Sequence, residues 1–108
     1  MKILLDECVT KKLKPHLTEF EVKTVVEMKW SGLKNGRLLS GAINEKFDIL
    51  LTIDKNIEHQ QNLSNYEIAV VVLDVEKSKI EFLLELLPKF KESVDKYEKG
   101  KEIGRAHV

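Results

Sequence analysis

Three acidic side chains follow two apolar segments of this chain, and these acids are its best candidates for chemistry. Asp6 and Glu7 end the run Ile3-Leu4-Leu5, and Asp54 ends a second run at residues 47–53. Two carboxylates held close together repel each other unless a cation lies between them. Mg²⁺ or Mn²⁺ binds oxygen ligands and keeps several waters, so one or two protein carboxylates are enough to hold it. We therefore expect a metal site of Asp6 and Asp54, with Glu7 as a third ligand, that could activate water for attack on a phosphodiester.

The same acids also suit a structural role. An acidic residue just before a helix can accept hydrogen bonds from the first backbone N–H groups of that helix. Asp6 or Glu7 could cap a helix over residues 8–17, and Asp54 could cap one or two helical turns over residues 55–61. The spacing of the acids leaves both interpretations open.

The acids can meet only if the strands before them are neighbours in one sheet. Apolar runs without a polar face are typical of parallel strands that helices cover on both sides. The pattern predicts strands at the first apolar run and at residues 20–26, 48–53 and 67–73, and helices at 8–17, 36–46 and from 78 onward, with a kink or break at Pro88. This alternation predicts an α/β fold, a three-layer α/β/α sandwich with a parallel central sheet of about four strands. With the first strand between the second and the third, Asp6 and Asp54 lie at one switch point of the sheet.

Length and composition indicate one globular domain. The chain has 108 residues, 43% of them hydrophobic, so we expect a single domain over residues 1–99 and a disordered tail over 100–108. Eighteen basic side chains balance eighteen acidic ones, which excludes the overall positive field of a typical nonspecific nucleic-acid binder. The single cysteine fits a reducing compartment, and the sequence shows neither a leader nor a long apolar run. A cytoplasmic protein without a membrane span is therefore expected.

Several polar residues could complete a crevice between the acids. Lys34, Arg37 and Lys55 flank it and could hold phosphates, although ordinary solvated charge would also account for each of them. His59 could donate a hydrogen bond there or simply be exposed, and Gln60 begins an unusual polar triplet.

Two further residues have both a functional and a structural interpretation. Trp30 could cover the core, or it could offer a surface on which single-stranded nucleic acid stacks. Cys8 directly follows the two acids, whose negative charge should keep its thiol protonated and unreactive. We expect Cys8 to be a small buried residue at the start of a helix.

Five segments of the chain resemble one known family. They are Lys2–Glu7, Glu21–Val25, Met28–Gly36, Leu51–Asn56 and His59–Leu63. Together they resemble the small PIN-like proteins of bacteria, a group of unknown function that is also classed among the toxin components of toxin–antitoxin pairs. The resemblance covers roughly residues 1–75.

The resemblance implies a fold, a cofactor and a set of site residues. PIN-like proteins are α/β/α sandwiches with an acidic ribonuclease site, dependent on Mg²⁺ or Mn²⁺, at the carboxyl ends of the strands. By position, Asp6 matches the acid after the first strand, Asp54 the acid of the Thr-x-Asp motif, and Thr52 its supporting threonine. Asn56 stands where many members carry a further aspartate, and Asn35 begins a region where relatives often place an acid. The chain thus lacks two carboxylates that the family pattern contains.

Three functional hypotheses follow. In the first, the chain is a metal-dependent ribonuclease toxin that a cognate antitoxin protein restrains, and its single-stranded RNA is bound by Lys34, Arg37, Lys55, Asn56, His59 and Gln60. In the second, it is a PIN-like module that binds RNA or protein without catalysis, through the Trp30 loop and residues 60–62. In the third, an apolar stripe over residues 80–97 packs on an antitoxin or on a second copy, which would make the chain a homo-oligomer.

Overall fold

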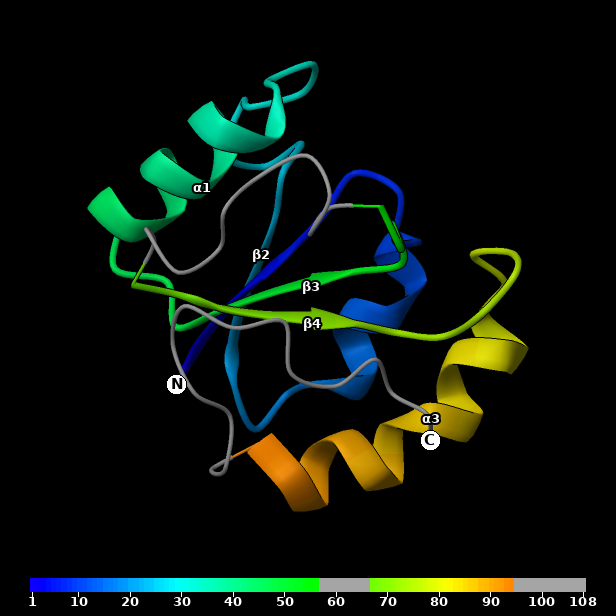
Figure 1. The fold of residues 1–108 in the computed structure, drawn as a ribbon. Coiled ribbons are helices and arrows are strands. Elements are labelled where there is room, and N and C mark those ends of the chain that lie inside the picture. The colour runs from blue at the N-terminus through cyan, green and yellow to red at the C-terminus, as the bar shows by residue number, and fades with distance from the viewer. Residues whose placement is uncertain (57–66, 95–108) are drawn as a thin grey trace.

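The chain folds around a parallel sheet with helices on both of its faces (Figure 1). The structure is a computed structural model, and it describes residues 1–56 and 67–94. The elements in chain order are β1 (Lys2–Leu5), the 3₁₀ helix η1 (Lys11–His16), β2 (Glu21–Thr24), α1 (Asn35–Asn44), β3 (Ile49–Thr52), β4 (Ala69–Val72) and α3 (Ile80–Ser93). The four strands are parallel and lie in the order β2-β1-β3-β4. The predicted α/β class and the predicted strand order are confirmed, although β2, β3 and β4 are each shorter than their predictions.

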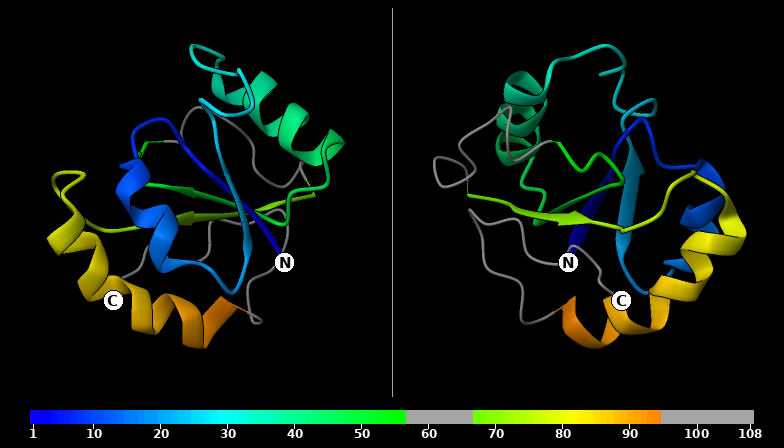
Figure 2. Two further views of the ribbon diagram at one scale, coloured as in Figure 1. Left: turned by 180° about the vertical axis from the view of Figure 1, so that it is seen from behind. Right: turned by 45° about the vertical axis from the view of Figure 1, so that its right-hand side comes forward.

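Both faces of the sheet are apolar because each is covered by a helical layer (Figure 2). Successive side chains of a strand point to opposite faces. The face toward η1 and α3 collects the strand residues Ile3, Leu5, Val22, Ile49, Leu51, Ala69 and Val71. The face toward α1 collects the strand residues Leu4, Leu50, Val70 and Val72. The three-layer arrangement therefore follows from strands with no polar side to turn toward water.

The segment after β1 differs from its prediction. The sequence predicts a helix over residues 8–17, but only the shorter 3₁₀ helix η1 forms. Its N-cap is Thr10, whose side chain accepts a hydrogen bond from the backbone N–H of Lys12. The prediction that Asp6 or Glu7 caps this helix is therefore wrong, and both acids belong to the turn that precedes it.

The other two helices also differ from their predictions at the ends. A helix is predicted over residues 36–46, but α1 spans Asn35–Asn44 and its N-cap position is Lys34, which makes no side-chain capping bond. Helix α3 is one continuous helix with Pro88 inside it, so the predicted alternative of two helices is wrong. Its buried residues are Leu83, Leu86, Leu87 and Phe90. Tyr97, the last member of the predicted stripe, and the predicted tail over 100–108 lie outside the described residues.

Trp30 is part of the core on the α1 face. Its ring meets that of Phe47 edge to face, with 6.3 Å between the ring centroids, and it packs against the buried cluster of that face. The interpretation of Trp30 as a cover over the core is confirmed. Within the two described ranges, no helix is long and apolar enough to cross a membrane.

Candidate functional site

Asp6 and Thr52 lie side by side because of the register between β1 and β3. Leu5 pairs with Leu51, and the ladder continues as the N–H of Asp6 donates to the carbonyl of Leu51 at 2.9 Å. The next residues along, Asp6 and Thr52, are therefore level with each other at the carboxyl ends of neighbouring strands. Neighbouring strands are ~4.8 Å apart, so two level side chains on one face can bond directly.

The hydroxyl of Thr52 connects the ends of the two strands. Its Oγ1 donates to Oδ2 of Asp6 at 2.8 Å and accepts from the backbone N–H of Asp54 at 3.0 Å. Thr52 is 0% exposed and is the one buried polar residue among those described. Because a buried hydroxyl needs partners, this link fixes the Asp6 carboxylate relative to the backbone of Asp54.

Each aspartate also stabilises the turn that follows its strand. Oδ1 of Asp6 accepts from the N–H of Glu7 at 2.8 Å, and Oδ1 of Asp54 accepts from the N–H of Asn56 at 2.9 Å. Asp6 thus stabilises a turn and does not cap η1, and most of the helical turns that Asp54 is predicted to cap, over residues 55–61, lie outside the described residues. An ionised carboxylate oxygen can accept more than one bond, so these contacts leave both groups able to bind a ligand.

Cys8 joins the same cluster, which sequence reasoning does not anticipate. The turn from Asp6 closes when the N–H of Val9 donates to the Asp6 carbonyl at 2.9 Å, and this brings the Cys8 sulfur to 3.3 Å from Oγ1 of Thr52 and 3.7 Å from Oδ2 of Asp6. The thiol donates to Oδ2 of Asp6, and its sulfur also contacts the Thr52 hydroxyl.

The Cys8 thiol is held in its protonated form. Burial of the sulfur raises the pKa of the Cys8 thiol, and the charges of Asp6 and Asp54 raise it further, while the hydrogen bond from Thr52 acts in the opposite direction. The residue as a whole is exposed, so the prediction of a buried residue is wrong, but its sulfur faces inward against Thr52. A protonated thiol is a weak nucleophile and a poor metal ligand.

Glu7 points toward the loop before α1 and away from a shared cluster. Its Oε1 accepts from the backbone N–H of Gly32 at 3.2 Å. Gly32 has a φ of 84°, a conformation that glycine adopts without strain. Within residues 1–56 and 67–94, no three His, Cys, Asp or Glu side chains gather to hold a metal ion.

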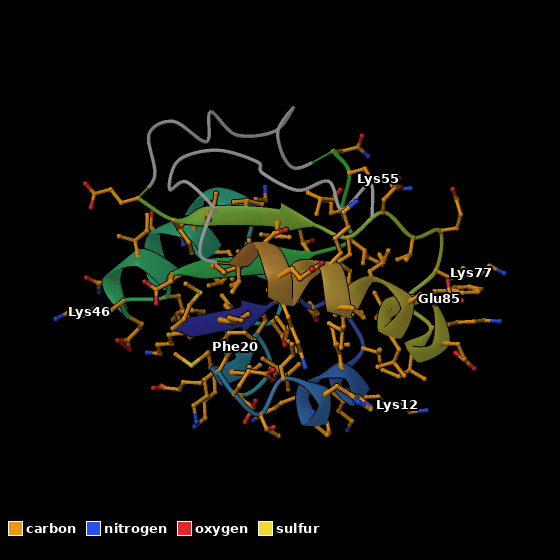
Figure 3. The ribbon with its side chains drawn as sticks, turned by 90° about the horizontal axis from the view of Figure 1, so that it is seen from below. Lys12, Phe20, Lys46, Lys55, Lys77 and Glu85 are labelled. Atoms are coloured by element: carbon orange, nitrogen blue, oxygen red, sulfur yellow. The ribbon has the colours of Figure 1, made fainter. Side chains whose placement is uncertain are left out.

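The predicted phosphate-binding residues are not gathered in one place. The Nζ atom of Lys55 lies 2.9 Å from Oδ1 of Asp74 and 3.8 Å from Oε1 of Glu76, so it ties the end of β3 to the loop after β4 (Figure 3). Lys34 and Arg37 are exposed at the start of α1. The two predicted RNA-binding residues outside the described ranges are His59 and Gln60.

A groove leads from the acids along the edge of the sheet. Its volume is about 1010 Å³, and Asp6 and Glu7 line one end of it while η1 and β2 form its walls. Among the described residues that line it, the cations are Lys11, Lys14 and Lys23. These three lysines were not predicted as site residues, because only the fold brings η1 and β2 together beside the acids.

The donor atoms at the strand ends suit a hard cation. Asp6 and Asp54 offer carboxylate oxygens, and Thr52 holds the carboxylate of Asp6 and the backbone of Asp54. Mg²⁺ is commonly bound by one or two protein carboxylates and several waters, so two acids suffice, whereas the protonated Cys8 thiol is unsuited to it. Glu7 could contribute through a water molecule or after leaving Gly32.

No family model matches the chain, and neither a curated protein nor a solved structure matches it. The resemblance to PIN-like proteins therefore stays a prediction from the residues.

Proposed function

We propose that this chain is a metal-dependent ribonuclease of PIN type that cleaves single-stranded RNA. The observation that supports this most is the bridge from Asp6 to the Asp54 backbone through the Thr52 hydroxyl, at the carboxyl ends of β1 and β3. Ligands of open α/β sheets bind at such switch points. The parallel sheet in the order β2-β1-β3-β4 is consistent with the fold that the resemblance implies.

In this proposal the side chains at the strand ends have different roles. Asp6 and Asp54 would hold Mg²⁺ or Mn²⁺, with Glu7 assisting through water, and the cation would supply an activated water and positive charge beside the phosphodiester. Thr52 acts as a positioning residue, because its hydroxyl orients the Asp6 carboxylate.

The surroundings of the acids would bind the substrate. Lys11 and Lys23 line the groove beside the acids and would attract the phosphates of a single strand, whereas Lys14 of the same groove is paired with Glu27. Lys34 and Arg37 could add to this from the start of α1. Lys55 would have to break its ion pair with Asp74 to reach RNA, so we expect it to contribute less to RNA binding.

The proposal extends to a biological role. The resemblance of the motif segments supports a toxin that a cognate antitoxin protein holds inactive, and the single cysteine supports a cytoplasmic site of action. The third hypothesis, assembly through α3, finds no support in its buried face, because Leu83, Leu87 and Phe90 already pack on the sheet.

Cleavage of a fluorescent single-stranded RNA tests the activity. Purified protein with Mn²⁺ or Mg²⁺ should cleave it, chelation should stop the reaction, and Asp6→Asn or Asp54→Asn should each reduce the rate by at least about a hundredfold, as is typical for groups that act on the reacting atoms. Glu85→Gln is the matched control, because Glu85 is an exposed acid of α3 (Figure 3) that does not line the groove. Metal-dependent cleavage that survives both aspartate substitutions would contradict the proposal.

A binding module without catalysis is the alternative that one observation favours. Among the described residues, no three Asp, Glu, His or Cys side chains lie close enough together to hold a metal ion. In addition, Asn56 stands where the family pattern has an acid. A thermal melt separates the two functions, since a ligand that binds the native state raises its melting temperature. A rise with Mn²⁺ that disappears in Asp54→Asn supports the metal site. RNA binding without any response to metal supports the module.

A further inference from the structure

Strand β2 is an edge of the sheet, and its outward side has a defined pattern. The N–H of Glu21 donates to the carbonyl of Met1, and the N–H of Val25 donates to the carbonyl of Leu5. Alternate residues of a strand direct their backbone N–H and C=O groups to opposite sides. Val22 and Thr24 therefore direct these groups away from β1. Such an edge is a template for another strand unless something covers it.

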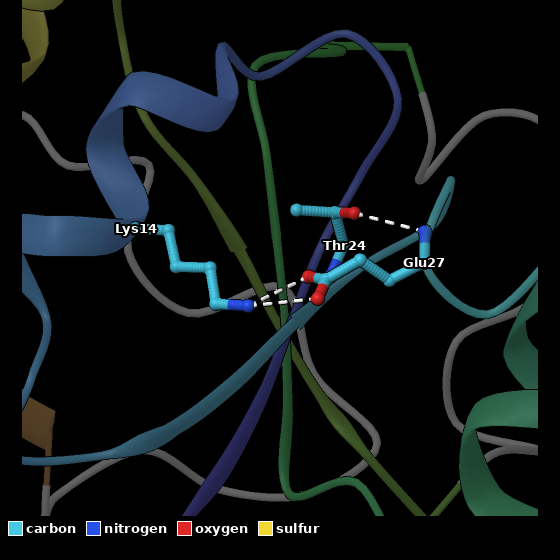
Figure 4. Close-up of polar contacts among 3 residues, drawn as sticks. All are labelled: Lys14, Thr24 and Glu27. Atoms are coloured by element: carbon cyan, nitrogen blue, oxygen red, sulfur yellow. Dashed lines mark hydrogen bonds and ion pairs between the residues drawn. The ribbon is translucent and has the colours of Figure 1, made fainter.

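One side chain covers part of this edge. Oε1 of Glu27 accepts from the outward N–H of Thr24 at 2.9 Å, and the N–H of Glu27 donates to Oγ1 of Thr24 at 3.0 Å (Figure 4). The carbonyl of Thr24 accepts from the N–H of Met28 at 3.1 Å. The Glu27 carboxylate therefore occupies the position in which the carbonyl of an added strand would lie.

Helix η1 holds the covering side chain in place. Nζ of Lys14 lies 2.8 Å from both carboxylate oxygens of Glu27. This hydrogen-bonded lysine lowers the pKa of Glu27, as does the backbone N–H of Thr24, so the carboxylate stays charged near neutral pH. In the part of the chain that the structure describes, no side chain bonds the outward N–H and C=O of Val22 in this way.

The residues of β2 are complementary to themselves when two copies run antiparallel. If Val22 lies opposite Val22 of a second copy, Glu21 lies opposite Lys23 of that copy, and Lys23 lies opposite its Glu21. Both charged side chains are exposed and lie on one face of the sheet. Opposite charges directly across an antiparallel pair are stabilising, and like charges are destabilising.

We propose that the edge of β2 binds a second copy of this chain, antiparallel about Val22, and that Glu27 limits this pairing. The groove of about 1010 Å³ between η1 and β2 leaves room beside the strand. With Glu27 in place, only the two Val22 residues exchange backbone bonds. Without it, the N–H of Thr24 can also donate to the carbonyl of Phe20 in the second copy, once on each side of the two-fold axis.

The pairing in the unaltered chain is weak. Val22 is only 6% exposed, so a second copy buries little further apolar surface there, and a short strand pair stays below the ~1,200 Å² of stable complexes. Removal of the Glu27 carboxylate should strengthen dimerisation by about tenfold or more, since it frees two further hydrogen bonds.

Sedimentation velocity over a concentration series tests this proposal. Glu27→Ala should dimerise about tenfold more tightly than the unaltered chain, whereas Glu27→Gln, which keeps an oxygen acceptor for Thr24, should behave like the unaltered chain. Adding Lys23→Glu to Glu27→Ala places like charges opposite each other and should abolish the gain. Adding Glu21→Lys as well should restore it.

The outcomes that overturn the proposal are equally specific. Unchanged association of Glu27→Ala, with a far-ultraviolet circular dichroism spectrum showing that it is folded, refutes the covering role. Tighter association that the charge reversal does not weaken refutes the pairing about Val22. If Glu27→Ala does not fold, amide exchange of the unaltered chain decides: exchange at Val22 must slow as protein concentration rises, and its failure to do so overturns the proposal.

Discussion

Replacing Thr52 by valine should destabilise the fold by about 2–3 kcal/mol. The change removes the hydroxyl but leaves its two hydrogen-bond partners, on Asp6 and Asp54, without it. Valine has nearly the same shape, so no cavity forms at this fully buried position. The Asp6 carboxylate loses a charge-assisted bond of about 1.5–3 kcal/mol, and the N–H of Asp54 loses its acceptor at about 1–3 kcal/mol. Both aspartates are half-buried, so water recovers part of this loss. For a domain of this size the melting temperature should fall by roughly 10–20 °C.

Urea denaturation followed by circular dichroism measures this loss, and Thr52→Ser is the matched control. Serine keeps the hydroxyl and removes one methyl group, which should cost only about 1 kcal/mol. The expected order of stability is therefore the unaltered chain, then Thr52→Ser, then Thr52→Val. If the valine variant is as stable as the serine variant, the hydroxyl does not hold the strand ends together and the reasoning about the site is wrong.

Two further predictions concern a strained backbone and a protonated thiol. Lys46 follows the C-cap of α1 and has a φ of 64°, a conformation that costs a residue with a side chain about 1 kcal/mol. Lys46→Gly should therefore raise the free energy of unfolding in urea by about 0.5 kcal/mol, whereas Lys46→Ala should not, and a loss in the glycine variant would contradict the strain. The raised pKa of Cys8 means less thiolate at any given pH, so iodoacetamide at pH 8 should modify the native chain more slowly than the chain unfolded in urea. Equal rates would show that the sulfur is not buried and that the pKa of the thiol is not raised.

The strand order could be predicted from the sequence because it depends on features that local patterns carry. Apolar runs that end in an acid mark strands buried on both faces, and right-handed crossovers between parallel strands leave few arrangements. Together they place Asp6 and Asp54 at neighbouring strand ends, as the order β2-β1-β3-β4 requires. The register that puts Thr52 level with Asp6 follows from the pairing of Leu5 with Leu51.

The directions of the side chains in the turns could not be predicted, because each depends on a competition among nearby donors and acceptors. Glu7 follows Asp6 in the chain, yet the N–H of Gly32 in a distant loop draws it away. Thr10 caps η1 in preference to the acids, since a hydroxyl at that position reaches the first free N–H groups. Cys8 reaches Thr52 only because a turn closes. The hydrogen-bond partners of these side chains depend on the three-dimensional arrangement of the turns, which the periodicity of apolar residues in the sequence does not predict.

The contrast between Thr52→Val and Asp6→Asn separates two reasons for a carboxylate at the end of β1. Asp6 accepts from the N–H of Glu7 on Oδ1 and from the hydroxyl of Thr52 on Oδ2, and asparagine keeps an oxygen at only one of these positions. If Asp6 serves only the fold, Asp6→Asn loses one of these bonds and some stability, and nothing else in the protein should change. If the charge itself is needed, Asp6→Asn remains folded and loses its response to Mn²⁺, while Thr52→Val loses stability first. That second outcome would show that the negative charge at the end of β1 serves to bind a cation.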